Sequence, residues 1–293
     1  HNEEEIERKD IRVGDTIYIQ RAGDVIPQVI SVDKSKRDEN SQIFKFPTKC
    51  LCGEETRKEI SKNTKKKDAV RRCIKGYECK FIAKEKLKHI VSKEAFNIDG
   101  LGKKVIEQFW DLNLIKEPSD IFNLNFSEIK KLEGWGELSI NNLKKAVEKS
   151  HIISLDKFIF SIGIRHIGQE NAKILAEFFV TINEFLTLCE EQKREKILKN
   201  LVELDGIGVT QVNSINNFFS NKKNLKILKN LTHQLTVNKF SIKKNEGKFS
   251  NKKLMFTGGF QNMSRSEAKE IVENNGGKVL GAVSKKLDFL VAG

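Results

Sequence analysis

The sequence predicts a multidomain, mainly α-helical protein with a short β region near its start and a small α/β region near its end. Three observations lead to this class. A glycine-containing tetrapeptide recurs four times, each time before an amphipathic helical pattern. Four of the five cysteines fall within one 30-residue window. Runs of alternating apolar and β-branched residues mark strands in the first 34 residues and again after residue 252.

Composition limits the classes of partner. The chain has 293 residues with 53 Lys+Arg against 40 Asp+Glu, a net charge of +13. This excess favours a polyanion, either nucleic acid or an anionic membrane surface, although a lysine-rich solubilising surface is the alternative. We see no apolar run of membrane-spanning length and no secretory signal, so we expect a soluble, intracellular protein without a membrane partner. The first methionine is Met255, so we expect a piece of a longer protein.

The first region predicts two strands, at 16–20 and 25–32, joined by a turn. Pro27 indicates an edge or a bulge in the second strand. Two strands bury little apolar surface, so we expect further partner strands upstream. Arg21 lies beside the exposed turn, and the apolar Val25 and Ile26 follow it. These three residues form a candidate surface for a nucleic-acid groove and its backbone.

The cysteine window follows a polar linker. Cys50, Cys52, Cys73 and Cys79 form two short pairs in a region too polar to fold by hydrophobic burial. Four thiolates can complete the tetrahedral shell of a structural Zn²⁺. The first pair has one residue between its cysteines, where zinc knuckles typically have two to four. The alternative is four reduced thiols on a basic loop. Cys189 stands apart and is expected to act as a small buried apolar residue.

A basic helix is expected at 81–95, and the repeats follow it. The tetrapeptides occupy residues 99–102, 133–136, 165–168 and 205–208, and their final glycines lie 34, 32 and 40 residues apart. Apolar residues in each following segment recur with i, i+3/i+4, i+7 spacing, which is typical of one buried helical stripe. We therefore expect one supersecondary unit, two helices joined by a tight hairpin, used four times.

The hairpins are candidate phosphate-binding sites. A glycine-rich turn at a helix N-terminus presents free N–H groups and the positive end of the helix dipole to an anion. A single G-x-G is often only a helix cap, but four in register on a chain of charge +13 favour phosphate. The candidate residues are Gly100, Gly102, Lys103, Gly134, Gly136, Gly168, Gly206 and Gly208.

Two departures qualify this pattern. His166 replaces the first glycine of the third hairpin, which we therefore expect to be the least regular, holding phosphate less closely or serving packing only. Glu137 and Val209 follow the second and fourth hairpins, so positive charge must come there from elsewhere.

The last region changes pattern again. A helix is expected to about residue 231, then a linker near 243–247. A strand at 253–257, a capping box at Ser264 and Glu267 that opens a helix to about residue 274, and further strands near 278–280 and 287–291 predict a small α/β domain. We expect its last elements to be missing.

This order of parts resembles the bacterial NAD-dependent DNA ligases, specifically their C-terminal portion. The resemblance implies part of an OB-fold at 1–43, a tetracysteine zinc finger at 44–82, four helix-hairpin-helix motifs at 83–240 and a truncated BRCT domain at 248–293. It is carried by residues 11–15 and 21–29 for the OB-fold, 46–50 for the zinc finger, 97–102 and 163–168 for the hairpins, and 257–258, 263–265 and 283–288 for the BRCT domain.

The resemblance implies an enzyme that seals single-strand nicks in duplex DNA during replication and repair. In this family a lysine in a K-x-D-G motif takes AMP from NAD, with Mg²⁺. The AMP passes to the 5′-phosphate, and the 3′-hydroxyl displaces it. Asp99-Gly100 follows Asn97, and Asp205-Gly206 follows Glu203, so neither completes the motif. The resemblance therefore places the catalytic lysine and the NAD and Mg²⁺ sites outside this chain, which should be inactive alone.

What remains resembles the half of the clamp that holds DNA. The resemblance implies that Arg21, Val25 and Ile26 meet the duplex at the nick, that the hairpins hold backbone phosphates across the minor groove, and that zinc is structural. It also implies a monomer that is cytoplasmic and associated with the nucleoid. The alternatives are a non-catalytic DNA-binding repair protein with zinc, hairpins and BRCT, and, less favoured, an accessory chain of a repair nuclease or helicase.

Overall fold

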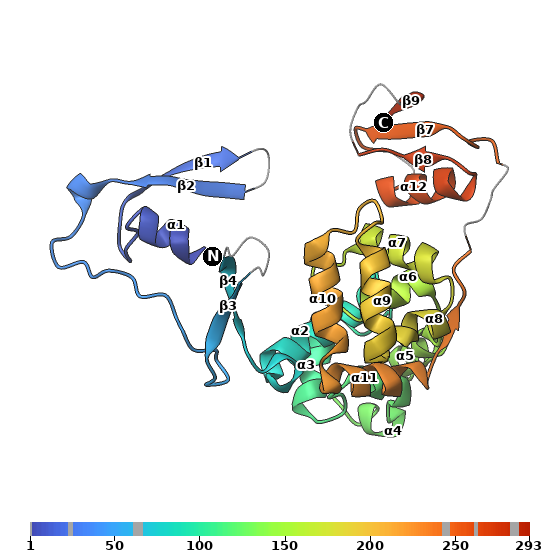
Figure 1. Ribbon diagram of the computed structural model, residues 1–293. Coiled ribbons are helices and arrows are strands. Elements are labelled where there is room, and N and C mark those ends of the chain that lie inside the picture. Colours follow the sequence, from blue (N-terminus) through green and yellow to red (C-terminus); the bar gives the residue numbers. More distant parts are fainter. Residues whose placement is uncertain (1, 23–25, 61–66, 242–246, 261–262, 282–286) are drawn as a thin grey trace. The chain divides into compact units, whose positions relative to one another are not determined.

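The computed structural model describes all residues except 1, 23–25, 61–66, 242–246, 261–262 and 282–286 (Figure 1). The chain forms two compact units, His1–Asn238 and Lys239–Gly293. The first unit holds the β region, the cysteine window and the helical hairpins. The second holds the small α/β region.

The β region begins with a helix that the sequence reasoning missed. α1 (Glu3–Arg8) is capped by the Asn2 side chain, which accepts a hydrogen bond from the Glu4 N–H at 3.1 Å. Three glutamates in its first turn suit the positive end of the helix dipole. The strands β1 (Ile17–Ala22) and β2 (Ile26–Val32) are confirmed, and they pair antiparallel with a bulge after Tyr18. A 3-10 turn, η1 (Lys34–Lys36), follows.

Ion pairs hold this region together where apolar burial is scarce. Tyr18, Ile19 and Ile30 are all at least half exposed. The Arg37 guanidinium instead contacts the carboxylate of Asp15 at 2.8 Å, and the Asp15 side chain is only 1% exposed. A buried charge of this kind needs its partner, so the contact fixes the start of β1 against the segment after β2.

The cysteine window contains a two-stranded antiparallel ribbon that was not predicted. Its strands are β3 (Thr56–Ile60) and β4 (Lys67–Cys73), with Thr56 opposite Cys73. A 3-10 turn, η2 (Gly76–Glu78), leads to α2 (Lys80–Ile90). Both strands are rich in Lys, Arg and Glu, so they lack the apolar alternation by which strands are recognised.

The helical body contains the four hairpins. Each hairpin joins two helices: α2 to α3, α4 to α5, α6 to α7 and α9 to α10 (Figure 1). Its elements are α3 (Lys103–Asp111), η3 (Pro118–Asn123), α4 (Phe126–Ile129), α5 (Glu137–Ser150), β5 (Ile152–Ser154), α6 (Leu155–Ser161), α7 (Gln169–Phe179), α8 (Ile182–Leu186), η4 (Thr187–Cys189), α9 (Glu191–Leu201), α10 (Val209–Phe219), α11 (Lys222–Thr232) and β6 (Thr236–Asn238), with β5 parallel to β6.

The predicted apolar stripes form the core of this body. Most stripe residues of α3, α5, α7 and α10 are buried, among them Ile106, Phe109, Leu143, Leu175 and Ile215 at 0–1% exposure. Val105 is half-buried, and Leu112, which follows α3, is exposed. Phe179, Phe185 and Phe219 meet edge to face, with ring centroids 5.3 and 5.4 Å apart. This geometry suits the quadrupoles of aromatic rings and packs the last two hairpins together.

The buried side chain of Arg194 also joins helices of this body. Arg194 on α9 is 5% exposed, and its guanidinium donates to the carbonyls of Leu188 and Phe219 at 3.0 and 3.1 Å and to the Asn216 side chain at 3.1 Å. These bonds replace the lost hydration and tie α9 to the end of α10.

The described residues of the second unit form a three-stranded parallel sheet and one helix. The strand order is β8-β7-β9, with β7 (Lys253–Thr257) central between β8 (Lys278–Val279) and β9 (Phe289–Ala292). The capping box opens α12 (Arg265–Asn274) as predicted, since Ser264 accepts from the Glu267 N–H at 3.2 Å. Leu254, Ala268 and Val272 form its buried core.

Among the described residues, no helix combines the length and apolarity that crossing a membrane requires.

Candidate nucleic-acid interface and metal centre

The four hairpin turns share one geometry. In each, the N–H of the residue after the first tetrapeptide glycine, or after His166, donates to a carbonyl three residues earlier, at 3.0–3.2 Å. These bonds run from Leu101 to Ile98, from Trp135 to Leu132, from Ile167 to Ile164 and from Ile207 to Leu204. The donor residue is buried in three hairpins, and Trp135 is half-buried in the second. The apolar residue therefore anchors each turn and leaves the residues around it exposed.

The second residue of each tetrapeptide has a left-handed backbone. Gly100, Gly134 and Gly206 have φ of 91°, 84° and 90°. His166 has φ 60° at the same position. The third hairpin therefore keeps a left-handed turn without glycine, with a φ smaller than that of the three glycines. That it holds phosphate less closely, or serves packing only, stays a prediction. Non-glycine residues bear a cost there.

The second glycines have no such requirement. Gly102, Gly136, Gly168 and Gly208 are the N-caps of α3, α5, α7 and α10, with φ between −68° and −92°. A Cβ added to Gly102, Gly136 or Gly168 would meet no heavy atom of the described chain within 4 Å. Serine is a better N-cap than glycine. Folding thus gives no reason for glycine at these three positions, and close approach of a ligand would give one.

The helix N-termini present free donors. In the described part of the chain, the N–H groups of Gly102, Lys103 and Lys104 have no hydrogen-bond acceptor, and the first bond of the helix runs from Ile106 to Gly102 at 3.0 Å. The second hairpin repeats this arrangement from Gly136. In the fourth hairpin, the Gln211 side chain accepts from the Gly208 N–H at 3.2 Å. The N-terminus of α10 therefore offers one free N–H group fewer than the N-terminus of α3.

Charge differs from hairpin to hairpin. Lys103 and Lys104 are exposed in the first turn of α3, where the helix dipole disfavours cations. They therefore weaken the helix and suit a bound anion. At the second hairpin, Glu137 pairs with Lys130 at 2.8 Å, and this contact lowers the pKa of the Glu137 carboxyl. The charges near the first hairpin thus favour phosphate binding more than the charges near the second hairpin do.

The hairpins lie in two pairs. A Cβ on Gly100 would lie 3.4 Å from Leu143 on α5, so the first hairpin contacts the helix of the second. The amide of Asn171 on α7 donates to the Gly206 carbonyl at 3.4 Å, so the third contacts the fourth. No sequence signal marked Asn171.

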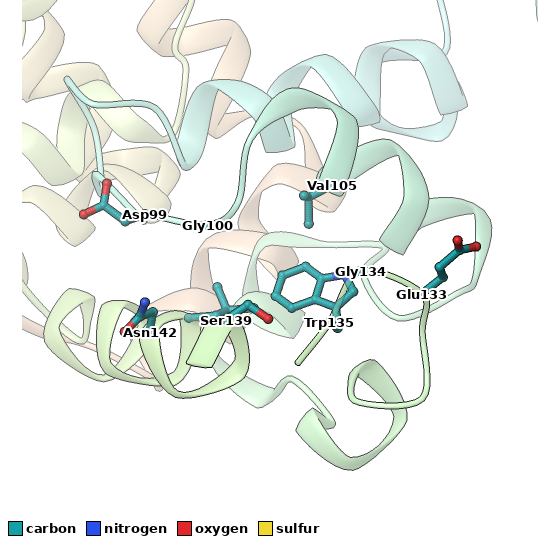
Figure 2. A pocket seen from close by; sticks show the side chains of 9 residues that line it. Asp99, Gly100, Val105, Glu133, Gly134, Trp135, Ser139 and Asn142 are labelled. Carbon is teal, nitrogen blue, oxygen red and sulfur yellow. The ribbon is translucent and has the colours of Figure 1, made fainter. Parts of the chain in front are cut away.

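The first pair encloses a cleft of about 470 Å³. Figure 2 shows Val105 and Trp135 in this cleft, with the carboxylates of Asp99 and Glu133 on either side. Two carboxylates on the rim repel phosphate, so an anion bound by the first hairpin belongs at the N-terminus of α3 and not inside the cleft.

The four cysteines converge. Their sulfur atoms all lie within 4.8 Å of one another, with Cys50 Sγ 3.7 Å from Cys79 Sγ and Cys52 Sγ 3.6 Å from Cys73 Sγ. A tetrahedral Zn²⁺ site with bonds of about 2.3 Å has edges of about 3.8 Å. The donor set and its size therefore fit a metal ion, and the one-residue spacer does not keep Cys50 and Cys52 apart.

Local turns explain how the short spacer works. Gly53 has φ 91°, and its N–H donates to the Cys50 carbonyl at 2.8 Å, which turns the chain sharply around the pair. The Glu54 backbone N–H bonds to the Cys52 sulfur and lowers the pKa of that thiol to about 7, whereas burial raises the pKa of Cys73. Cys189 lies apart from the cluster, as expected, but it is half-buried and not buried as predicted.

The cysteine segment is linked on both sides. Glu3 of α1 accepts from Arg71 at 2.9 Å and from Lys58 at 2.8 Å, and these contacts lower the pKa of the Glu3 carboxyl. Asp68 on β4 pairs with Arg72 at 2.7 Å and also with Arg165 of the third hairpin. Ion pairs therefore connect the β region to the cysteine segment, and the cysteine segment to the hairpins.

The remaining site predictions fall at the end of the first strand. Arg21 is exposed on β1, opposite Pro27. Ile26 begins β2, and its side chain is outside the described part. Val25 lies outside the described residues, as do 283–286 of the predicted BRCT signature.

Comparison with known proteins identifies three regions. Residues 1–41 match the NAD-dependent DNA ligase OB-fold domain, residues 157–228 match the helix-hairpin-helix motif, and residues 244–293 match the BRCA1 C Terminus (BRCT) domain. The helix-hairpin-helix match covers the third and fourth hairpins. The predicted fold classes of these three regions are thereby confirmed.

Whole-chain relatives agree with the regional matches. The DNA ligase of Pelagibacter ubique is 52% identical over 295 residues, which cover 100% of this chain and 43% of that ligase. The DNA ligases of Maricaulis maris and Xanthobacter autotrophicus are 41% and 39% identical, with the same shares covered. The chain thus spans less than half the length of these relatives. Over its whole length the chain is therefore similar to part of these DNA ligases, and it carries regions that match the NAD-dependent DNA ligase OB-fold, helix-hairpin-helix and BRCT families.

Proposed function

We propose that this chain is the DNA-holding part of an NAD- and Mg²⁺-dependent ligase that seals single-strand nicks in duplex DNA. The N-termini of α3, α5, α7 and α10 each take a backbone phosphate. One observation carries the proposal: Gly102, Gly136 and Gly168 have ordinary extended backbones and open space where a side chain would lie. Glycine at such N-caps is of use to a phosphate that approaches the backbone closely.

The contacts differ in strength along the four hairpins. The first is the strongest, because Lys103 and Lys104 add charge to the free N–H groups of α3. The second is weakened by Glu133 and Glu137. Backbone contacts carry no base information, so binding is independent of sequence and falls as salt rises. Arg21, Val25 and Ile26 meet the duplex near the nick.

The four cysteines hold one structural zinc ion. Sulfur separations of 3.6 and 3.7 Å, close to the edges of a tetrahedral zinc–thiolate site, support this. When bound, zinc supplies cross-linking only. Cys73 ends β4 and Cys79 precedes α2, so their ligation fixes the ribbon against the first helix of the hairpin body.

The remaining parts of the proposal rest on the similarity to these ligases. The proposed domains are 1–43 for OB, 44–82 for the zinc finger, 83–240 for the four helix-hairpin-helix motifs and 248–293 for BRCT. The protein is a monomer of the bacterial cytoplasm, associated with the nucleoid. The lysine that takes AMP is not among these residues, so this chain alone takes no AMP from NAD.

A chimaera tests the proposal. This chain is fused behind the part of the Pelagibacter ubique DNA ligase that it does not match. We expect the chimaera to take AMP from labelled NAD and to seal nicked duplex. Gly102→Ser with Gly168→Ser should leave AMP uptake unchanged and lower sealing at limiting DNA roughly tenfold or more, since a hydrogen bond to a charged group contributes about 1.5–3 kcal/mol. Sealing that is unaffected by both substitutions would contradict the proposal.

A further inference from the structure

A second cavity lies away from the hairpin N-termini. It has a volume of about 850 Å³ and is bounded by the cysteine ribbon, α2, the third hairpin and α10. Lys86 of α2 is among the residues that line it. The phosphate-holding role proposed above does not use this lysine.

Lys86 differs from the other lysines of its helix. Lys84 pairs with Asp111 at 2.8 Å, and Lys88 pairs with Glu85 and Glu107 at 2.6 and 2.7 Å. Within the described chain, Lys86 has no ion pair. Its Nζ lies instead 4.1 Å from the centroid of the Tyr77 ring and 6.0 Å from that of Phe218.

This apolar setting changes the amine. Burial lowers the pKa of the Lys86 ammonium to about 8. A substantial part of Lys86 is therefore a neutral amine near pH 8, the form that acts as a nucleophile.

The walls of the cavity suit an anionic reagent. They include Arg71, Arg72 and Arg165, with His89 beside them and Glu85 as the acidic residue of the lining. Glu85 is occupied by Lys88. Arg71 pairs with Glu3, and Arg72 and Arg165 both pair with Asp68, so the lining itself has three arginines against the one carboxylate of Glu85.

We propose that Lys86 is an acylation site, modified by small acyl phosphates that enter this cavity. The amine Nζ attacks the acyl carbon, an N–C bond forms, and the C–O bond to phosphate breaks. Phosphate leaves with the electron pair of that bond, and the proton lost by the nitrogen goes to solvent. The product is a neutral amide lysine in place of a cation, between Tyr77 and Phe218.

The expected selectivity follows from the neutral fraction. At pH 8 an amine of pKa about 8 is roughly half neutral, against well below 1% for an ordinary lysine. Nucleophilicity falls as basicity falls, and by the trend known for thiols this reduces the advantage roughly tenfold. We therefore expect Lys86 to react about tenfold faster than Lys84 and Lys88.

The test is acetylation of the metal-loaded 293-residue chain by acetyl phosphate at pH 8, with the rate at each lysine measured by peptide mass spectrometry. Lys86 should react about tenfold faster than Lys84 and Lys88, and the three rates should converge in denaturant. A rate at Lys86 equal to or below theirs in the folded chain would overturn the proposal.

Two matched variants of α10 test the role of the cavity. Asn217 lines it, and Asn213 on the same helix does not. Asn217→Asp adds a carboxylate to the cavity and should slow acetylation of Lys86 severalfold, whereas Asn213→Asp should leave the rate unchanged. Equal rates in the two variants would show that the cavity does not set the reactivity of Lys86, and the proposal would fail.

Discussion

The two glycines of the second hairpin have different proposed roles, Gly134 in folding and Gly136 in phosphate binding. Gly134 has φ 84° and Gly136 has φ −89°, and a Cβ on either would meet no heavy atom of the described chain within 4 Å. The two positions therefore differ in backbone conformation and hardly at all in packing. Gly134→Ser and Gly136→Ser make a matched pair of substitutions.

The magnitude follows from the backbone. A left-handed non-glycine residue costs about 1–2 kcal/mol. Replacing glycine also restricts the unfolded chain, which returns about 0.4–1 kcal/mol. Gly134→Ser should therefore lower the free energy of unfolding by about 1 kcal/mol. Gly136→Ser gains the same unfolded-state term, and serine is a better N-cap by a few tenths of a kcal/mol. It should leave stability unchanged or raise it slightly.

Urea unfolding of the two variants, followed by circular dichroism with reductant and metal present, measures both values. The first unit must unfold as one transition for the comparison to hold, which a second probe, tryptophan fluorescence, checks. A loss of stability in Gly136→Ser as large as that in Gly134→Ser would refute the assignment of different roles to the two glycines.

Four further outcomes are expected. Metal analysis should find one zinc per chain, and chelation should increase amide exchange in residues 44–82, in wild type and in Cys189→Ser alike; zinc near zero with reduced thiols would contradict this. Lys86→Met should be more stable than wild type by about 3 kcal/mol below pH 8. The pKa of Lys86 is lowered to about 8 in the folded state, so the unfolded chain binds more protons between pH 8 and about 10.4. The stability of the wild type therefore rises with pH in this range, and the stability difference from Lys86→Met disappears. A stability difference that does not change with pH would argue against a lowered pKa of Lys86. Val180 has φ 60° in a three-residue turn, where the Thr181 N–H bonds to the Phe179 carbonyl at 2.6 Å. This conformation is strained for valine, so Val180→Gly should stabilise the chain by about 1 kcal/mol. Destabilisation of this variant in urea melts would exclude strain at this site. Arg194→Leu should lower stability by several kcal/mol, since it leaves buried carbonyls without donors; a change below about 1 kcal/mol would show that these bonds contribute little.

The hairpin helices could be predicted because one local signal marks each of them. A glycine pair marks the turn before α3, α5 and α10, and Gly168 alone marks it before α7. The apolar residues that follow at helical spacing set the buried face, so these four helices form where expected. The capping box of α12 is equally local. Such signals need no knowledge of distant residues.

The missed elements are stabilised by partners remote in sequence. α1 is a six-residue helix, and its Glu3 is held by Lys58 and Arg71 of the cysteine ribbon. The ribbon strands are polar, so nothing in their own pattern indicates pairing. The environment of Lys86 likewise depends on Phe218, which only the folded chain brings near it.

The third hairpin forms without the first glycine. The buried Ile164 and Ile167 and the bond between them close the turn, with His166 in a left-handed conformation. Packing of the turn residues therefore outweighs the local cost of a left-handed histidine.

The hairpin N–H groups themselves give the most direct test of phosphate binding. Backbone amide resonances of the ¹⁵N-labelled chain are followed while a nicked duplex is added at low salt. The amides of Gly102, Lys103 and Gly168 should shift most and saturate together, and the shifts should vanish as salt rises. Shifts confined to lysine-rich surfaces, with these amides unmoved at saturation, would contradict phosphate binding by the hairpins.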